Sequence, residues 1–203
     1  MEPSVHPAVG IVLAGGRSSR MGHDKAAAAV AGRSMLEWVS EALSRATERV
    51  LIVGRSQAPG HTAIPDPGDR YRGPLAGLAA AASREPGATL VVAAVDQPWV
   101  RPETMRRLVA RTTTLPVVPV DDHGARQTTC AVYPARSLGD IREELDAGGS
   151  IQSLLDRVAF DPVVPAEWRE WGEDGRSWFS VDRPEHIAEG LDRFGVPGTQ
   201  PPM

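Results

Sequence analysis

The chain has 203 residues, one cysteine, a net charge of −4 and an isoelectric point near 5.7. This length is sufficient for one α/β domain with its own hydrophobic core. With 41% hydrophobic and 24% charged residues, the composition excludes a disordered chain, a collagen and a coiled coil. The acidic balance argues against a protein that binds duplex nucleic acid, because such proteins carry basic surfaces.

The sequence also predicts where the protein works. Its longest apolar run, Ala88 to Val95, is too short to span a membrane. The first residues lack a basic stretch followed by a hydrophobic one, and the lone Cys130 cannot form an internal disulfide. We therefore expect a cytoplasmic protein that binds neither membranes nor nucleic acid.

Apolar strands and helical patterns alternate through the first half of the chain. Strands are expected at 9–14, 50–53 and 89–95, and helices after the capping box at 34–37 and over 76–83 and 103–111. This alternation predicts a mostly parallel sheet with helices on both faces, a three-layer α/β/α Rossmann-like fold. Ligand sites in such sheets lie at the carboxyl ends of the strands.

The second half is less regular but continues the same domain. Strands are expected at 117–120, 128–133 and 178–181, and helices at 138–145, 151–157 and 184–194. No internal repeat or linker divides the chain. We therefore expect a single domain over 1–195, followed by a frayed tail at 196–203.

A glycine-rich loop follows the first strand. Gly15 and Gly16 let the backbone approach a ligand and present N–H groups to it. Arg20 can grip phosphate oxygens with its planar fork, and Lys25 can neutralise them as a point charge. Neither the P-loop nor the dinucleotide-binding pattern is present. The alternative is a flexible turn with solvated charges, but Lys25 is the only lysine among 22 basic residues, which favours a chemical role.

Asp96 directly follows the all-apolar strand at 89–95. A carboxylate at this edge of the sheet can hold Mg²⁺ together with substrate phosphates. Such a metal neutralises charge in phosphoryl and nucleotidyl transfer. The alternative is that Asp96 only caps or turns the chain before the next helix.

The loop at 13–25 resembles the nucleotidyltransferase signature Leu-Ala-Gly-Gly-x-Ser-x-Arg-Met-Gly-x-Asp-Lys and matches all ten fixed positions. The sequence is similar to the molybdenum cofactor guanylyltransferase family, which attaches GMP to molybdopterin. The Gly15–Gly16 pair and Asp24 favour the guanylyl branch over its cytidylyl relatives, which usually have Ala-Gly and Pro at these places.

This resemblance implies a role for each of the motif residues. Leu13, Ala14, Gly15 and Gly16 would hold the nucleotide through backbone contacts. Arg20 and Lys25 would act on the phosphates, and Asp96 would hold Mg²⁺.

Residues 73–78, Gly-Pro-Leu-Ala-Gly-Leu, match the family's second motif. The resemblance places Gly77 in the nucleotide site and implies that Asp66, seven residues before the motif, lies close to the nucleotide. Taken alone, Asp66 between two prolines is a typical turn residue, and Gly73-Pro74 is a typical helix start.

Two further family motifs appear in altered form. The acceptor-side motif keeps its glycine, glutamine and tyrosine at 124–133, so Gln127 is a candidate contact of the pterin. The late motif Asn-x-Asn-Thr-Pro appears as Ser-Val-Asp-Arg-Pro at 180–184, in a chain without asparagine. Asp182 is either a second metal ligand beside Asp96 or a cap of the helix that begins at Pro184.

The expected reaction is transfer of GMP from GTP to the molybdopterin cofactor with Mg²⁺, which forms molybdopterin guanine dinucleotide and pyrophosphate. The resemblance also suggests molybdenum-insertion proteins or molybdoenzymes as partners. One alternative is a transferase that uses CTP or another phosphorylated acceptor. A different class of alternative is a non-catalytic nucleotide-binding regulator that has lost transfer.

Overall fold

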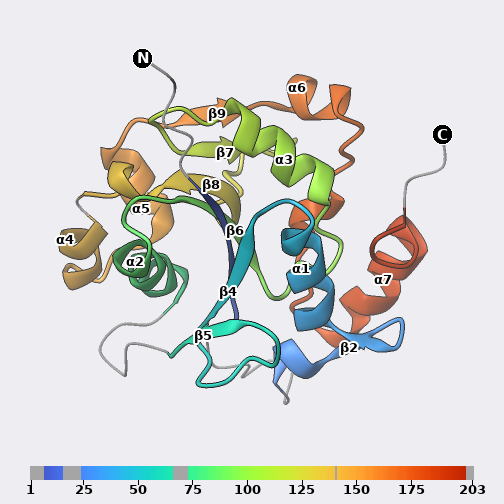
Figure 1. The fold of residues 1–203 in the computed structure, drawn as a ribbon. Coiled ribbons are helices and arrows are strands. Elements are labelled where there is room, and N and C mark those ends of the chain that lie inside the picture. The colour runs from blue at the N-terminus through green and yellow to red at the C-terminus, as the bar shows by residue number, and fades with distance from the viewer. Residues whose placement is uncertain (1–6, 16–23, 66–72, 140, 200–203) are drawn as a thin grey trace.

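The computed structural model describes residues 7–15, 24–65, 73–139 and 141–199 (Figure 1). The strands are β1 (Ala8–Leu13), β2 (Ala29–Val30), β3 (Arg33–Ser34), β4 (Arg49–Val53), β5 (Thr62–Ile64), β6 (Thr89–Ala94), β7 (Val117–Pro119), β8 (Cys130–Pro134) and β9 (Asp161–Val163). The α-helices are α1 (Met35–Ser44), α2 (Pro74–Arg84), α3 (Pro102–Arg111), α4 (Ile141–Asp146), α5 (Ile151–Arg157), α6 (Pro165–Glu170) and α7 (Pro184–Phe194). The 3₁₀-helices are η1 (Lys25–Ala27), η2 (Ala135–Ser137) and η3 (Arg176–Trp178). Among these described helices, none is both long and apolar enough to cross a membrane.

A mixed sheet with the strand order β5-β4-β1-β6-β8-β7-β9 forms the centre of the molecule. The half that carries β1 is parallel: β1 pairs with β4 and β6, and β4 pairs with β5. In the other half, β8 is antiparallel to both β6 and β7, and β9 is parallel to β7. The sheet is therefore mostly parallel, as predicted from the sequence.

The alternating side chains of the strands face two separate helical layers. Ile11 packs in a core with Leu78 of α2, whereas the next residue, Val12, packs on the other face with Leu43 of α1 and Leu108 of α3. Figure 1 shows α2, α4 and α5 on one side of the sheet and α1 and α3 on the other. The predicted three-layer α/β/α architecture is confirmed.

Helix α7 packs on this framework through a small aromatic core. The ring of Trp99 makes an edge-to-face contact with Phe179 and lies 6.1 Å from Phe194, centroid to centroid. A Cβ atom on Gly190 would lie 2.3 Å from the Trp99 ring. Only a glycine therefore lets α7 approach this closely.

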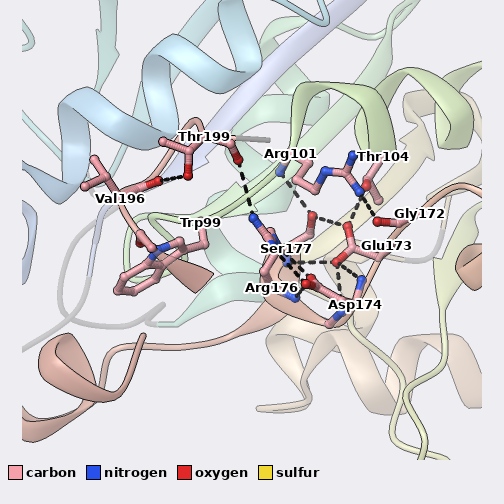
Figure 2. Close-up of polar contacts among 12 residues, drawn as sticks. Trp99, Arg101, Thr104, Gly172, Glu173, Asp174, Arg176, Ser177, Val196 and Thr199 are labelled. Carbon is pink, nitrogen blue, oxygen red and sulfur yellow. Dashed lines mark hydrogen bonds and ion pairs between the residues drawn. The ribbon is translucent and has the colours of Figure 1, made fainter. Parts of the chain in front are cut away.

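A buried carboxylate anchors the segment that leads to α7 (Figure 2). Glu173 is 3% exposed and accepts hydrogen bonds of 2.5 Å from the hydroxyl groups of Thr104 and Ser177. The Ser177 hydroxyl accepts a further hydrogen bond from the backbone N–H of Arg101. These contacts tie the chain before Phe179 to the first turn of α3.

Most elements expected from the sequence are present, but the strand at 178–181 is wrong. Trp178 ends η3, and the residues after it form no strand. Both sides of β6 are occupied by β1 and β8, so this segment cannot pair with β6, and its Val181 N–H bonds to the Asp96 carbonyl beyond the end of that strand. The aromatic residues instead pack against other rings: Trp178 contacts Trp168, and Phe179 contacts Trp99.

Some short elements were not expected from the sequence. Strand β5 has only three residues and lies in a stretch rich in proline and glycine, so it lacks a visible period. At the end of α7, Gly195 accepts a 2.7 Å hydrogen bond from the Trp99 indole. In the segment where the tail was expected to begin, the Thr199 carbonyl accepts a hydrogen bond from Arg176 (Figure 2). Residues 200–203 lie outside the described part of the chain.

Candidate active site

A pocket with about 800 Å³ of open space lies at the carboxyl ends of β1, β4 and β6. The register of the sheet brings these ends together, because Leu13 pairs with Val53 on one side and with Ala94 on the other. Its described lining residues are Leu13, Ala14, Gly15, Asp24, Lys25, Ala26, Val53, Gly54, Gly73, Pro74, Gly77, Ala94, Val95 and Asp96.

The charged centre of the pocket is a lysine between two carboxylates. The Lys25 Nζ lies 3.1 Å from Oδ2 of Asp96 and 2.7 Å from Oδ1 of Asp182. Lys25 and Asp96 are 18% and 21% exposed in their side chains, and Asp182, at 48%, lies at the rim. Residues far apart in the sequence thus meet at one point, since Asp182 is 157 positions from Lys25.

Asp24 fixes the start of η1 and so the position of Lys25. Its Oδ1 accepts a 3.1 Å hydrogen bond from the backbone N–H of Ala26, which caps the helix. Its Oδ2 pairs with the guanidinium of Arg55, just after β4. The loop that carries Lys25 is therefore tied to the neighbouring strand.

Asp96 sits in a turn with its own supports. The buried side chain of Gln97 accepts a 3.0 Å hydrogen bond from Ala94 N–H and donates one to the Thr129 hydroxyl. The backbone N–H of Val181 donates a 2.7 Å hydrogen bond to the Asp96 carbonyl. This last bond places the segment with Asp182 directly beside Asp96.

Asp182 is supported from its other side by α7. Its backbone N–H lies 3.1 Å from Nδ1 of His186, in the first two turns of that helix. The N-cap residue of α7 is Arg183, so Asp182 is not its cap. Of the two alternatives for Asp182, helix capping is wrong, and a role beside Asp96 remains.

Close approach of the backbone at the pocket depends on a glycine after β4. Gly54 has φ +91°, and a Cβ atom there would lie 2.2 Å from the Gly15 Cα. Any other residue would push the chain at Gly15 away from β4. Gly54 and Arg55 were not expected in the site, although their place directly after the apolar strand β4 was a usable signal.

The Lys25 ammonium stays charged in this setting. Burial alone would lower its pKa, but the hydrogen bonds and charges of Asp182 and Asp96 outweigh burial and raise the pKa above its usual value. A permanent positive charge therefore faces the pocket, where phosphate groups could bind.

The structure brings together most of the residues that the sequence singled out. Six of them line the pocket: Leu13, Ala14, Gly15, Lys25, Gly77 and Asp96. A seventh, Asp182, forms an ion pair with Lys25. Gly16, Arg20 and Asp66 lie outside the described residues.

Other candidates lie elsewhere. The Gln127 side chain donates to Asp121 at 2.9 Å and does not line this pocket. Cys130 is fully buried, and burial raises the pKa of its thiol. Trp168 is buried against Trp178 and donates to the Val120 carbonyl. Cys130 and Trp168 are therefore packed in the interior.

Asp96 and Asp182 form a donor set that fits a hard divalent cation. Both carboxylates form an ion pair with the same positive group, the Lys25 ammonium, so their oxygens already converge on one cation. Within the described ranges there is no group of three or more Asp, Glu, His or Cys suited to a metal. Mg²⁺ usually takes one or two carboxylates, with water and substrate phosphates completing its shell, so two carboxylates are enough.

Solved structures share this fold. The molybdopterin-guanine dinucleotide biosynthesis protein A of Archaeoglobus fulgidus superposes with a TM-score of 0.77 over 91% of this chain and 97% of that protein, at 22% identity. At this identity the likeness concerns the fold, and it defines an α/β nucleotidyltransferase fold.

Sequence comparison then gives the family. The profile of the MobA-like NTP transferase domain matches residues 10–163, and the chain belongs to this family. It is 35% identical over 159 residues to a probable molybdenum cofactor guanylyltransferase of Bacillus licheniformis, covering 73% of this chain and 80% of the relative. A protein of the same name from Pelotomaculum thermopropionicum is 34% identical over 188 residues, covering 90% and 91%. The resemblance found in the sequence is thus confirmed.

Proposed function

We propose that this protein transfers GMP from GTP to the molybdopterin cofactor, forming molybdopterin guanine dinucleotide and pyrophosphate. The observation that carries the proposal is the contact of Lys25 with Asp96 and Asp182 in a pocket that is also lined by Leu13, Ala14 and Gly15 of the family's nucleotide motif. The names of the relatives support the choice of base and acceptor.

Each part of the pocket has a task in this proposal. The backbone of 13–16 and the glycine at 77 would hold the nucleotide, and Asp66 is proposed to act at the same site. Lys25 and Arg20 bind the phosphates. An oxygen of the acceptor's phosphate forms a bond to the α-phosphorus of GTP, and the bond to the bridging oxygen breaks, so pyrophosphate leaves with the electron pair. Positioning and charge neutralisation supply most of the acceleration.

Asp96 and Asp182 are the proposed ligands of Mg²⁺. The bound metal would neutralise negative charge on the departing pyrophosphate. The protein's own part is to hold both carboxylates in place: the turn closed by Gln97 fixes Asp96, and the bond from Val181 fixes the segment with Asp182.

The proposal also covers the organisation of the chain and its surroundings. Residues 1–195 act as one domain, with the nucleotide in the N-terminal half and the acceptor in the C-terminal half. The reaction takes place in the cytoplasm, where GTP is available. The product then passes to molybdenum-insertion proteins or molybdoenzymes.

Pyrophosphate release tests the proposal. The protein is mixed with Mg²⁺ and each of GTP, CTP, ATP and UTP, with and without molybdopterin cofactor. Release that requires both GTP and the cofactor is the expected result. Release with CTP would overturn the base, and release with another phosphorylated acceptor would overturn the acceptor. GTP binding without any release would favour a regulator.

A further inference from the structure

The Lys25 ammonium lies where the proposed metal would have to bind. Its Nζ is 2.7 Å from the nearer oxygen of Asp182 and 3.1 Å from that of Asp96. Mg²⁺ binds carboxylate oxygens at about 2.1 Å. A metal held by these two oxygens would therefore be in close contact with the ammonium, and like charges at that distance repel strongly.

The charges of Lys25, Asp96 and Asp182 also favour replacement of the ammonium by the metal over binding of both at once. Among the described residues, the two carboxylates of Asp96 and Asp182 and the ammonium of Lys25 together carry a net charge of −1. A divalent cation in place of the ammonium would bring the site to neutrality. The released ammonium would then be available to the negatively charged phosphates of a nucleotide in the same pocket, which Lys25 lines.

We infer that Lys25 and the divalent cation occupy the Asp96–Asp182 pair in turn. In the free protein Lys25 neutralises the carboxylates, and metal binding displaces its ammonium from them toward the phosphate site. This inference rests on the proposed function, because it assigns an order of events to the same site. Lys25 has the flexible four-carbon stem that such a movement needs.

Asp182 contributes to this exchange through its negative charge. Its carboxylate makes the shorter of the two ion pairs with Lys25. A carboxylate holds an ammonium more strongly than a neutral amide does. Asp182 thus strengthens both the hold on Lys25 and the hold on the metal that replaces it.

Metal affinity without nucleotide is the first test. Binding of Mn²⁺ to the full chain is followed by the electron paramagnetic resonance signal of the free ion. Lys25→Met removes the competing charge, so we expect its Kd for Mn²⁺ to fall about tenfold. Asp182→Asn should weaken binding. Asp122→Asn, an exposed carboxylate paired with Arg169, is the matched control and should bind as the wild type does.

Movement of Lys25 itself is the second test, and the sequence makes it simple. Because Lys25 is the only lysine, biosynthetic labelling with [¹³Cε, ¹⁵Nζ]-lysine gives one side-chain resonance. Addition of Mg²⁺ without nucleotide should shift this resonance along a saturating curve. In Asp96→Asn the Mg²⁺-induced shift should require higher concentrations.

Three results would overturn the inference: equal or weaker Mn²⁺ binding by Lys25→Met, a Lys25 resonance that stays fixed at saturating Mg²⁺, or no Mn²⁺ binding by the nucleotide-free wild type. Any of these in a protein that still transfers GMP would leave the proposed function intact. Loss of GMP transfer in the wild type would instead overturn the proposed function.

Discussion

A Cβ atom on Gly77 would lie 2.7 Å from the Cδ2 of Leu13. Gly77 is in the first turns of α2, and Leu13 ends β1, so this contact joins the two elements under the pocket. The small residue lets the helix lie against the strand end. It therefore sets the position of the backbone that we propose to hold the nucleotide.

Gly77→Ala should weaken nucleotide binding while the protein still folds. The added methyl group must push the Leu13 side chain aside, which shifts the pocket floor and costs about 1–3 kcal/mol. We expect the KM for GTP to rise several-fold with a smaller change in kcat. Gly87→Ala is the control, because Gly87 has no neighbour within 4 Å of the added atom. A KM equal to that of the control variant would contradict the prediction.

Asp96→Ala should abolish turnover. It removes one of the two carboxylates proposed to hold the metal, and loss of one such electrostatic group typically lowers kcat by about 10²–10³-fold or more. Steady-state pyrophosphate release measures the effect, and circular dichroism checks the fold. Asp122→Ala serves as the control at an exposed carboxylate. Full activity of Asp96→Ala would refute the assignment.

Removing the positive charge of Lys25 should lower activity more than changing the shape of the charged group. Lys25→Ala removes the positive charge next to the phosphates, and we expect kcat/KM to fall about 10²-fold. Lys25→Arg keeps the charge but replaces a point charge with a planar fork, so its loss should be smaller. The assignment of Lys25 fails if both variants are fully active.

The first half of the fold could be predicted because its local signals agree with one another. The capping box at Ser34 has both of its predicted hydrogen bonds, and α3 covers Pro102–Arg111, where a helix was expected over 103–111. The second half depends more on tertiary contacts. Trp178 and Phe179 have strand-like residue types, but their rings fill gaps between helices.

The candidate site was predictable where each residue belongs to a continuous local motif. Lys25 and Asp96 follow from their local patterns and Gly77 from the family resemblance, and all three line one pocket. The contact of Asp182 with Lys25 was not predictable, because it depends on the bond from Val181 to Asp96 and on the position of α7. No local pattern reports a contact across 157 positions.

Glu173→Ala should destabilise the fold by about 2–4 kcal/mol, because it leaves two buried hydroxyl groups and the backbone N–H of Gly175 without their acceptor. Urea unfolding measures the change. Glu170→Ala, at an exposed position in α6, should change stability little. A Glu173 variant as stable as this control would show that the network in Figure 2 contributes little.

The ion pair between Arg111 and Asp161 should make stability depend on pH. Its hydrogen bonds of 2.6 and 2.8 Å hold the pKa of Asp161 below the usual value. Because the pKa of Asp161 is lower in the folded protein, the ion pair stabilises the fold at pH values above the unfolded-state pKa of about 3.9. This contribution is lost as the pH falls through the folded-state pKa. Since the pair is about one-third exposed, we expect Asp161→Asn to cost only about 1 kcal/mol at neutral pH.

The measurement is urea unfolding of the wild type and Asp161→Asn at neutral pH and in the acid range. The difference in unfolding free energy between them should shrink as the pH falls below about 4. Asp192→Asn, at an exposed position in α7, controls for the loss of a surface charge. A difference that stays constant or grows in acid would contradict the role given to Asp161.

The central claim is that the α-phosphate of GTP is transferred to the molybdopterin cofactor. The most direct measurement follows GTP labelled in either its α- or its γ-phosphate, with Mg²⁺, the cofactor and this protein. We predict that the α-label appears in molybdopterin guanine dinucleotide and the γ-label in pyrophosphate. An α-label that stays in GTP, or that appears as free GMP whether or not the cofactor is present, would contradict the account.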